Sequence, residues 1–409
     1  MLGRVRSSGI RQRVVVSLAV FALSACATVV VAATSANSSA PAGNPPTVQM
    51  SSAQPSSTGP VPVESREQQF RIGLDYADTL PWKSDAALGA ALDDAVELGA
   101  GWIRVDLSWN DIQPDKPDRY EWQRFDRVAR AARARGLQVL AVIGYTPAWE
   151  RQPGCTSGGQ VCPPVDPALF AAFAADAAKR YAPMGVHTWE IWNEENASFW
   201  LPRPDPAAYA QLLSLTAASM RHADPKAYLV MGGLAAGVTD PKTGYLSAAD
   251  FLTAVSKLGA NKLVDAVADH PYTYPHLLSD VTTFGDSFER ISSVKGSLVQ
   301  ILATYGTPNL PIWITEVGAP TVGPGAPEDG RKVTTGTHVT EQRQAEIAAD
   351  SVGAAAANSH VDALFWFADQ DDGKNPVQTW HYYGLRRGDG SKKPAFSAFQ
   401  HAISAFRDQ

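Results

Sequence analysis

Two glutamates in this chain each come directly after a short run of strand-forming residues. Glu194 ends the segment WEIWNE at residues 189–194, and Glu316 ends PIWITE at residues 311–316. The C-terminal ends of the strands in a parallel barrel meet at one face, and catalytic side chains lie there. Two carboxyl groups at that face could act as an acid and as a nucleophile or base, which is the chemistry that cleaves a glycosidic bond. The joint pattern favours this interpretation over two unrelated surface glutamates.

The rest of the sequence predicts alternating strands and helices that would position these two residues. We expect strands at residues 70–75, 102–107, 139–144, 188–192, 228–231, 264–269, 312–315 and 363–367. We expect helices at 86–98, 124–135, 167–181, 206–222, 248–258, 288–305, 340–357 and 395–406. Eight strand–helix repeats are the count of a single closed (β/α)8 TIM barrel. A doubly wound open sheet is the alternative, but no glycine-rich turn follows the first strand.

The composition fits one large domain that does not bind nucleic acid. The chain has 409 residues, of which 45% are hydrophobic, and a barrel of roughly 250 or more residues would occupy residues 67–409. The net charge is −6, whereas nucleic-acid-binding domains are typically basic, so nucleic-acid binding is not indicated. The 11 tryptophans could stack on sugar rings or pack in the core. We expect a monomer, and the residues imply no cofactor.

Residues 1–33 have the pattern of an export segment, with arginines ahead of an apolar run over 14–33. Cleavage after Ala33 would release a secreted protein, whereas the uncleaved run, at about 20 residues, could anchor the chain in a membrane. The segment 23–26 also resembles a lipobox, in which Cys26 would carry a lipid. All three fates place the barrel outside the cell or on the outer face of the cytoplasmic membrane. Residues 34–66 are rich in Ser, Pro and Ala and predict a flexible linker.

Two further cysteines, Cys155 and Cys162, flank a polar loop segment. In an oxidising compartment such a pair predicts a disulfide that closes the loop. A metal site would need more ligands at suitable spacing, so no metal is expected.

Other side chains that suit carbohydrate recognition follow the expected strands. Polar, charged and aromatic groups at one face could contact the hydroxyls and the apolar faces of a sugar. The candidates for substrate binding are Arg104, Trp109, Tyr145, Trp149, Asn193, His270, Tyr272 and Trp366.

With these residues in place, the stretch from residue 70 to the C-terminus resembles glycoside hydrolase clan A, closest to families 39 and 5. The resemblance implies that Glu194 is the acid/base and Glu316 the nucleophile of a retaining enzyme. It also implies that Asn193 binds the 2-hydroxyl of the sugar. His270 and Tyr272 match the His-x-Tyr of the clan, with the tyrosine hydroxyl near the nucleophile.

The resemblance implies two further roles: Arg104 would hold Glu316 ionised, and Trp366 would form the sugar platform. The chain also departs from the family patterns. Tyr145 stands where family 5 members often have a histidine, Glu195 follows the acid/base where a proline is more common, and no room remains for the β-sandwich of family 39.

We therefore expect an exported retaining glycoside hydrolase that cleaves a β-linked polysaccharide or oligosaccharide. A non-catalytic carbohydrate-binding barrel of the cell envelope is an alternative that would not need both carboxylates. A transglycosylase would use the same residues and differ only in the acceptor. Glu190, two residues before Trp192, is expected to lie deeper in the barrel or to pair with Arg104.

Overall fold

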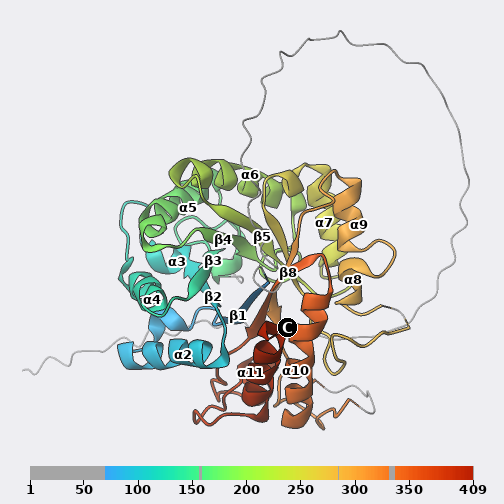
Figure 1. Cartoon of the computed structure of the whole chain (residues 1–409). Helices are drawn as coiled ribbons and strands as arrows, with labels where there is room; N and C mark the ends of the chain where they lie inside the picture. The colour runs from blue at the N-terminus through green and yellow to red at the C-terminus, as the bar shows by residue number, and fades with distance from the viewer. Residues whose placement is uncertain (1–69, 156–158, 284, 331–336, 409) are drawn as a thin grey trace, which may run out of the picture.

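The computed structural model describes residues 70–155, 159–283, 285–330 and 337–408, so the expected export segment and linker lie outside the described residues. Within them, eight parallel strands close into a barrel in the order β1 to β8, and β8 pairs with β1 (Figure 1). Helices lie around this barrel, between successive strands. The predicted (β/α)8 fold is confirmed.

The elements lie close to the expected ranges. The strands are β1 (Arg71–Asp75), β2 (Trp102–Ser108), β3 (Gln138–Gly144), β4 (Thr188–Asn193), β5 (Tyr228–Ala235), β6 (Ala266–His270), β7 (Ile312–Val317) and β8 (Val361–Phe367). The helices are α2 (Asp85–Leu98), α3 (Trp109–Ile112), α4 (Gln123–Arg133), α5 (Pro167–Tyr181), α6 (Pro206–Ala223), α7 (Ala248–Lys257), α8 (Glu289–Ser292), α9 (Leu298–Thr304), α10 (Glu341–Ala357) and α11 (Pro394–Arg407). None of the helices in this described part of the chain is long and apolar enough to cross a membrane.

Capping residues explain why the helices begin where the sequence predicts. The N-cap side chains that accept a hydrogen bond from the first turn include Ser84, Asp166, Asp205, Ser247 and Thr340. One expected helix, 288–305, is wrong as a single element, because the chain there forms the two short helices α8 and α9. Gly296, with a φ of +76°, interrupts the helix, and Ser297 starts the second one by accepting a hydrogen bond from Gln300 N.

The interior of the barrel changes from apolar to charged along its axis. An interior cluster of buried side chains consists of Leu140, Val230, Ala266, Ala268, Trp313, Ala363 and Phe365. Two residues after Trp313 on β7, the inward side chain is Thr315, which lies 3.4 Å from Glu190 on β4. The apolar cluster therefore forms a packed floor, and the polar groups above it lie towards the C-terminal ends of the strands.

Candidate active site

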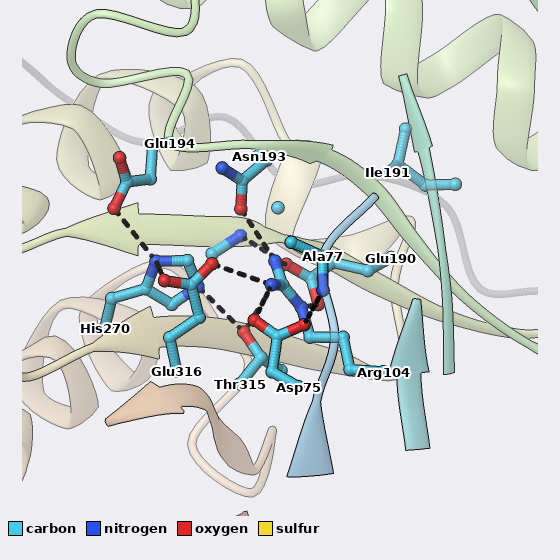
Figure 2. Close-up of polar contacts among 12 residues, drawn as sticks. Asp75, Ala77, Arg104, Glu190, Ile191, Asn193, Glu194, His270, Thr315 and Glu316 are labelled. Atoms are coloured by element: carbon cyan, nitrogen blue, oxygen red, sulfur yellow. Dashed lines mark hydrogen bonds and ion pairs between the residues drawn. The ribbon is translucent and has the colours of Figure 1, made fainter. Parts of the chain in front are cut away.

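Arg104 on β2 connects the ends of four strands inside the barrel (Figure 2). Its guanidinium is buried and donates five hydrogen bonds. Nη1 donates to Asp75 Oδ2 and to Glu316 Oε1, both at 2.7 Å. Nε and Nη2 donate to the two oxygens of Glu190 at 2.9 and 2.8 Å, and Nη2 also donates to Asn193 Oδ1 at 2.6 Å. The structure thus places Arg104 against Glu316, and it pairs Glu190 with Arg104 as expected.

Glu194 and Glu316 both lie next to His270 at the mouth of the barrel (Figure 2). One oxygen of each carboxyl group and one ring nitrogen of His270 lie within 4.8 Å of one another. His270 Nδ1 is 3.1 Å from Glu194 Oε1 and 3.7 Å from Glu316 Oε2. The Tyr272 hydroxyl donates to Glu316 Oε2 at 2.6 Å. Six of the predicted site residues are therefore brought together: these four, Arg104 and Asn193.

Local irregularities turn two of the site side chains into the barrel. Alternation along β7 would place Thr315 inside and Glu316 outside, but the register of β7 against β8 shifts within Ile314–Val317, and both side chains face inward. On β4, Trp192 has a φ of +75° and packs against the outer aromatic layer, so the next residue, Asn193, faces Arg104.

The two glutamates have pKa values shifted in opposite directions. Burial raises the pKa of Glu194, and the hydrogen bond with His270 only partly opposes this. Burial would also raise the pKa of Glu316, but the positive charges of His270 and Arg104 and the Tyr272 hydroxyl outweigh it, so the pKa is lowered. Glu194 is therefore suited to carry a proton and Glu316 to be ionised.

The environment of His270 keeps this imidazole positively charged. Burial alone would lower its pKa, but Glu316 and the hydrogen bond with Glu194 raise it to about 9. Its second nitrogen, Nε2, lies 3.0 Å from Thr315 Oγ1, so both ring nitrogens have a partner. His270 thus acts as a fixed cation between the two carboxyl groups.

Sequence reasoning missed Asp75, the last residue of β1. Its Oδ1 accepts a hydrogen bond from Ala77 N at 2.8 Å, while Oδ2 accepts from Arg104. Burial and the nearby Glu316 raise the pKa of Asp75 to about 7, although Arg104 opposes the shift. The signal that could have identified it is the one used for Glu194, namely an acidic residue at the C-terminal end of a strand.

The expected sugar platform at Trp366 is wrong in this structure. Trp366 is completely buried and packs against Phe399 of α11, with ring centroids 5.7 Å apart, so it faces the helix layer. Because side chains alternate along a strand, the next residue, Phe367, points to the other face. Phe367 is partly exposed and contacts Tyr383, which in turn packs edge-on against Tyr272 beside the site.

Trp109 and Trp149 also belong to the packing around the barrel. Trp109 is completely buried against Phe170 and Phe173 of α5, and Trp149 packs edge-on against it at 5.5 Å. The indole N–H of Trp149 donates to Gln113 O at 2.7 Å. The expectation that Trp109 contacts substrate is therefore not supported, because the side chain is completely buried, whereas for the partly exposed Trp149 a substrate contact remains a prediction.

Tyr145 lies at the end of β3, as expected, in a left-handed conformation with a φ of +69°. Burial and the neighbouring carboxyl of Asp106 raise its pKa well above the usual value, and the two side chains are hydrogen-bonded. Asp106 follows Arg104 by two residues on β2 and was not identified from the sequence. A substrate contact by Tyr145 remains a prediction.

The predicted disulfide between Cys155 and Cys162 is present, with the Cα atoms 5.9 Å apart. It closes the connection between β3 and α5. Among the described residues, one group could offer three metal ligands, namely Glu194, His270 and Glu316. Both nitrogens of His270 and both oxygens of Glu316 already have hydrogen-bond partners, so the arrangement is better suited to proton transfer and nucleophilic attack.

Comparison with known families agrees with this site. Residues 63–371 match the model of the cellulase family, glycosyl hydrolase family 5, over more than half of the chain. The chain belongs to glycosyl hydrolase family 5. As a family 5 member it is a glycosidase of glycoside hydrolase clan A, the clan inferred from the Asn-Glu and Ile-Thr-Glu segments.

Solved structures with the same barrel include proteins of families 39 and 5. A family 39 glycoside hydrolase from Bacteroides cellulosilyticus WH2 is 21% identical, with a TM-score of 0.63. The alignment covers 85% of this chain and 66% of that protein's chain. A family 39 β-xylosidase from Caulobacter crescentus is 21% identical, with a TM-score of 0.58, and the alignment covers 83% of this chain and 72% of that protein's chain. A GH5_18 protein from Streptomyces cattleya in complex with GlcNAc is 18% identical, with a TM-score of 0.61 and coverage of 83% and 81%. The search of curated proteins found no match to the sequence of this family 5 member.

Proposed function

We propose that this family 5 member is an exported, retaining glycoside hydrolase that cleaves β-linked glycosides by double displacement. The observation that carries the proposal is the close approach of Glu194 and Glu316, with carboxyl oxygens within 4.8 Å. Retaining enzymes have carboxyl groups about 5–5.5 Å apart, whereas inverting enzymes leave about 6.5–9.5 Å for a water molecule. The opposite pKa shifts supply one acid and one nucleophile for the same bond.

In the first step, an ionised oxygen of Glu316 attacks the anomeric carbon while Glu194 donates its proton to the departing glycosidic oxygen. A covalent glycosyl-enzyme forms, and the leaving group departs as an alcohol. Arg104 and Tyr272 orient the two oxygens of Glu316 for this attack. Asn193, oriented by Arg104 through its carbonyl oxygen, can bind the 2-hydroxyl through its amide group.

In the second step, Glu194 acts as the base. It removes a proton from water, the water oxygen attacks the anomeric carbon, and the bond to Glu316 breaks, so that both glutamates return to their starting states. The positive charge of His270 stabilises Glu194 while the latter is ionised between the two steps. A transglycosylase would follow the same path with a sugar hydroxyl in place of water.

The substrate class and the location rest on different observations. The neighbours include a protein named as a β-xylosidase and one solved with GlcNAc, which supports a β-linked sugar at the site. The export pattern at residues 1–33 and the disulfide support a secreted protein or one held on the outer face of the membrane. Family membership favours an enzyme over a non-catalytic binding barrel.

The test uses dinitrophenyl β-glycosides of xylose, N-acetylglucosamine, glucose and mannose. Glu316→Ala should abolish turnover of every substrate that the wild type cleaves. Glu194→Ala should release the activated phenol in a burst and then stall, and added azide should restore turnover and yield a β-glycosyl azide. Glu346→Ala, which removes an exposed glutamate of α10, is the matched control. If azide instead rescued Glu316→Ala with retained stereochemistry and did not rescue Glu194→Ala, Glu316 would be the acid/base and Glu194 the nucleophile.

A further inference from the structure

Glu195, next to the acid/base, is buried on the opposite side of the barrel wall. Its side chain is completely inaccessible and lies against Gly232 of β5, where an added β-carbon would be 2.3 Å from Glu195 Oε2. At the adjacent Gly233, a β-carbon would lie 1.9 Å from His270 Nε2. Gly232 therefore makes room for Glu195 on one side of the barrel wall, and Gly233 makes room for His270, the partner of Glu194, on the other.

The hydrogen bonds of Tyr209 favour the protonated form of Glu195. Both carboxyl oxygens are buried without a hydrogen-bond partner among the described residues, and the hydroxyl of Tyr209 on α6 faces them. Tyr209 donates its own proton to Ile191 O at 2.9 Å and accepts from Gly232 N at 3.0 Å. The lone pair that remains on this hydroxyl can accept a hydrogen bond from a carboxylic acid, whereas a carboxylate could use the hydroxyl only if its proton turned away from Ile191 O.

The charged groups around Glu195 agree with a neutral side chain. Burial raises its pKa to about 8 and Glu190 of β4 adds to the shift, while the backbone N–H of Glu195 itself, the Tyr209 hydroxyl and His270 of β6 oppose it. None of these neighbours is a lysine or an arginine that could pair with a buried carboxylate.

The backbone at the end of β4 needs such anchoring. Glu194 itself has a φ of +46° and Trp192 a φ of +75°, conformations that cost non-glycine residues roughly 1–3 kcal/mol each and persist only where neighbours hold them. On the C-terminal side, Asn196 exchanges hydrogen bonds with the backbone of Ala235 and donates to Leu246 O. Glu195 lies between this anchor and Glu194.

We propose that Glu195 is a positioning residue that, as a neutral carboxylic acid donating to Tyr209, fixes the acid/base Glu194 against His270. The inference rests on the proposed role of Glu194 and goes beyond it. Glu195 does not touch the substrate, because it lies behind the wall that the site faces. Its loss should displace the carboxyl of Glu194 and impair the steps in which that group transfers a proton.

This role predicts a loss that depends on the leaving group. A displacement of about 1 Å can cost about 100-fold in rate where a catalytic group must be aligned. Cleavage of a poor leaving group needs the proton of Glu194, whereas dinitrophenolate departs without it. A substitution that only weakened the fold would lower both rates equally.

The experiment measures kcat/KM of Glu195→Ala and Glu195→Gln on the 4-methoxyphenyl and 2,4-dinitrophenyl β-glycosides of one sugar that the wild type cleaves. Glu195→Ala should lose about 10–100-fold on the methoxyphenyl glycoside and less than about threefold on the dinitrophenyl glycoside. Glu195→Gln, whose amide can donate to Tyr209 as the carboxylic acid does, should stay within about threefold of the wild type on both. Glu346→Ala controls for removal of a glutamate elsewhere.

Equal losses on both glycosides, or a Glu195→Gln variant as impaired as Glu195→Ala, would overturn the inference. If Glu195→Ala does not fold, Glu195→Asp takes its place, because its carboxyl group is one methylene short of Tyr209. Failure of the proposed function is distinguishable: the wild type would then cleave neither glycoside. Wild-type turnover that Glu194→Ala impairs, combined with an unselective loss in the Glu195 variants, would reject the positioning role alone.

Discussion

Replacement of Arg104 by lysine tests whether this one side chain sets both the geometry and the ionisation of the site. The guanidinium donates to Asp75, Glu190, Asn193 and Glu316 at 2.6–2.9 Å from a position that is 1% exposed. A lysine keeps the charge but has one nitrogen, which cannot reproduce the planar fork. A single nitrogen cannot reach all three carboxyl partners as the fork does, so at least one of them would lack a bonded cation.

The magnitude follows from burial. Removing one partner of a buried ion pair costs about 3–5 kcal/mol, and because lysine retains a charge we expect a loss of about 3 kcal/mol in the free energy of unfolding. Glu316 would lose its hydrogen bond to Nη1 and part of the positive potential that lowers its pKa. We expect kcat/KM to fall about 100-fold to 1000-fold, the scale seen when one preorganised donor is removed.

The pH profile gives the sign of the electrostatic effect. In the proposed mechanism Glu316 must be ionised to attack, so activity should appear as the pH rises through the pKa of Glu316. Arg104→Lys raises that pKa, and the acid limb of kcat/KM should therefore move to higher pH. Urea unfolding and the pH profile on a dinitrophenyl glycoside measure the two effects, with Arg135→Lys at an exposed ion pair with Asp93 as control. An unmoved acid limb together with kcat/KM within threefold of the wild type would refute the reasoning.

Three further predictions concern other parts of the barrel. Trp366→Ala should lower the free energy of unfolding by about 3–5 kcal/mol and leave KM unchanged. Phe367→Ala should raise KM about tenfold and lower the free energy of unfolding by less. A larger effect on KM at Trp366 than at Phe367 would restore Trp366 as the sugar platform. As the pH rises from about 4.5 towards 8, the free energy of unfolding of the wild type should fall relative to that of Glu195→Gln. The slope should be at most about 1.4 kcal/mol per pH unit, because folded Glu195 keeps a proton that the unfolded chain releases. Parallel stability curves for the two proteins would contradict a neutral Glu195. Alkylation without reduction should leave Cys155 and Cys162 unmodified, and replacing both by serine should cost about 2 kcal/mol, since the closed loop is short; thiol labelling of the untreated protein would show that the bond does not form.

The sequence by itself determined the barrel and the strands that carry Glu194 and Glu316. Strand and helix periodicities, caps such as Ser247 and the position of a glutamate after a strand are properties of neighbouring residues, so they can be read without tertiary structure. The same holds for Cys155 and Cys162, whose separation allows a closed loop. Once eight repeats close in order, parallel strands bring Glu194 and Glu316 to one face.

Only the tertiary structure decided which side of the wall each strand-end residue faces. Side chains alternate with a period of two, so a single bulge or left-handed residue reverses the outcome. The register shift in β7 turns Glu316 inward and the positive φ of Trp192 turns Asn193 inward, whereas regular alternation buries Trp366 under α11. The opposite pKa shifts of the two glutamates likewise depend on distances to charges from other strands, and these distances exist only after the barrel has closed.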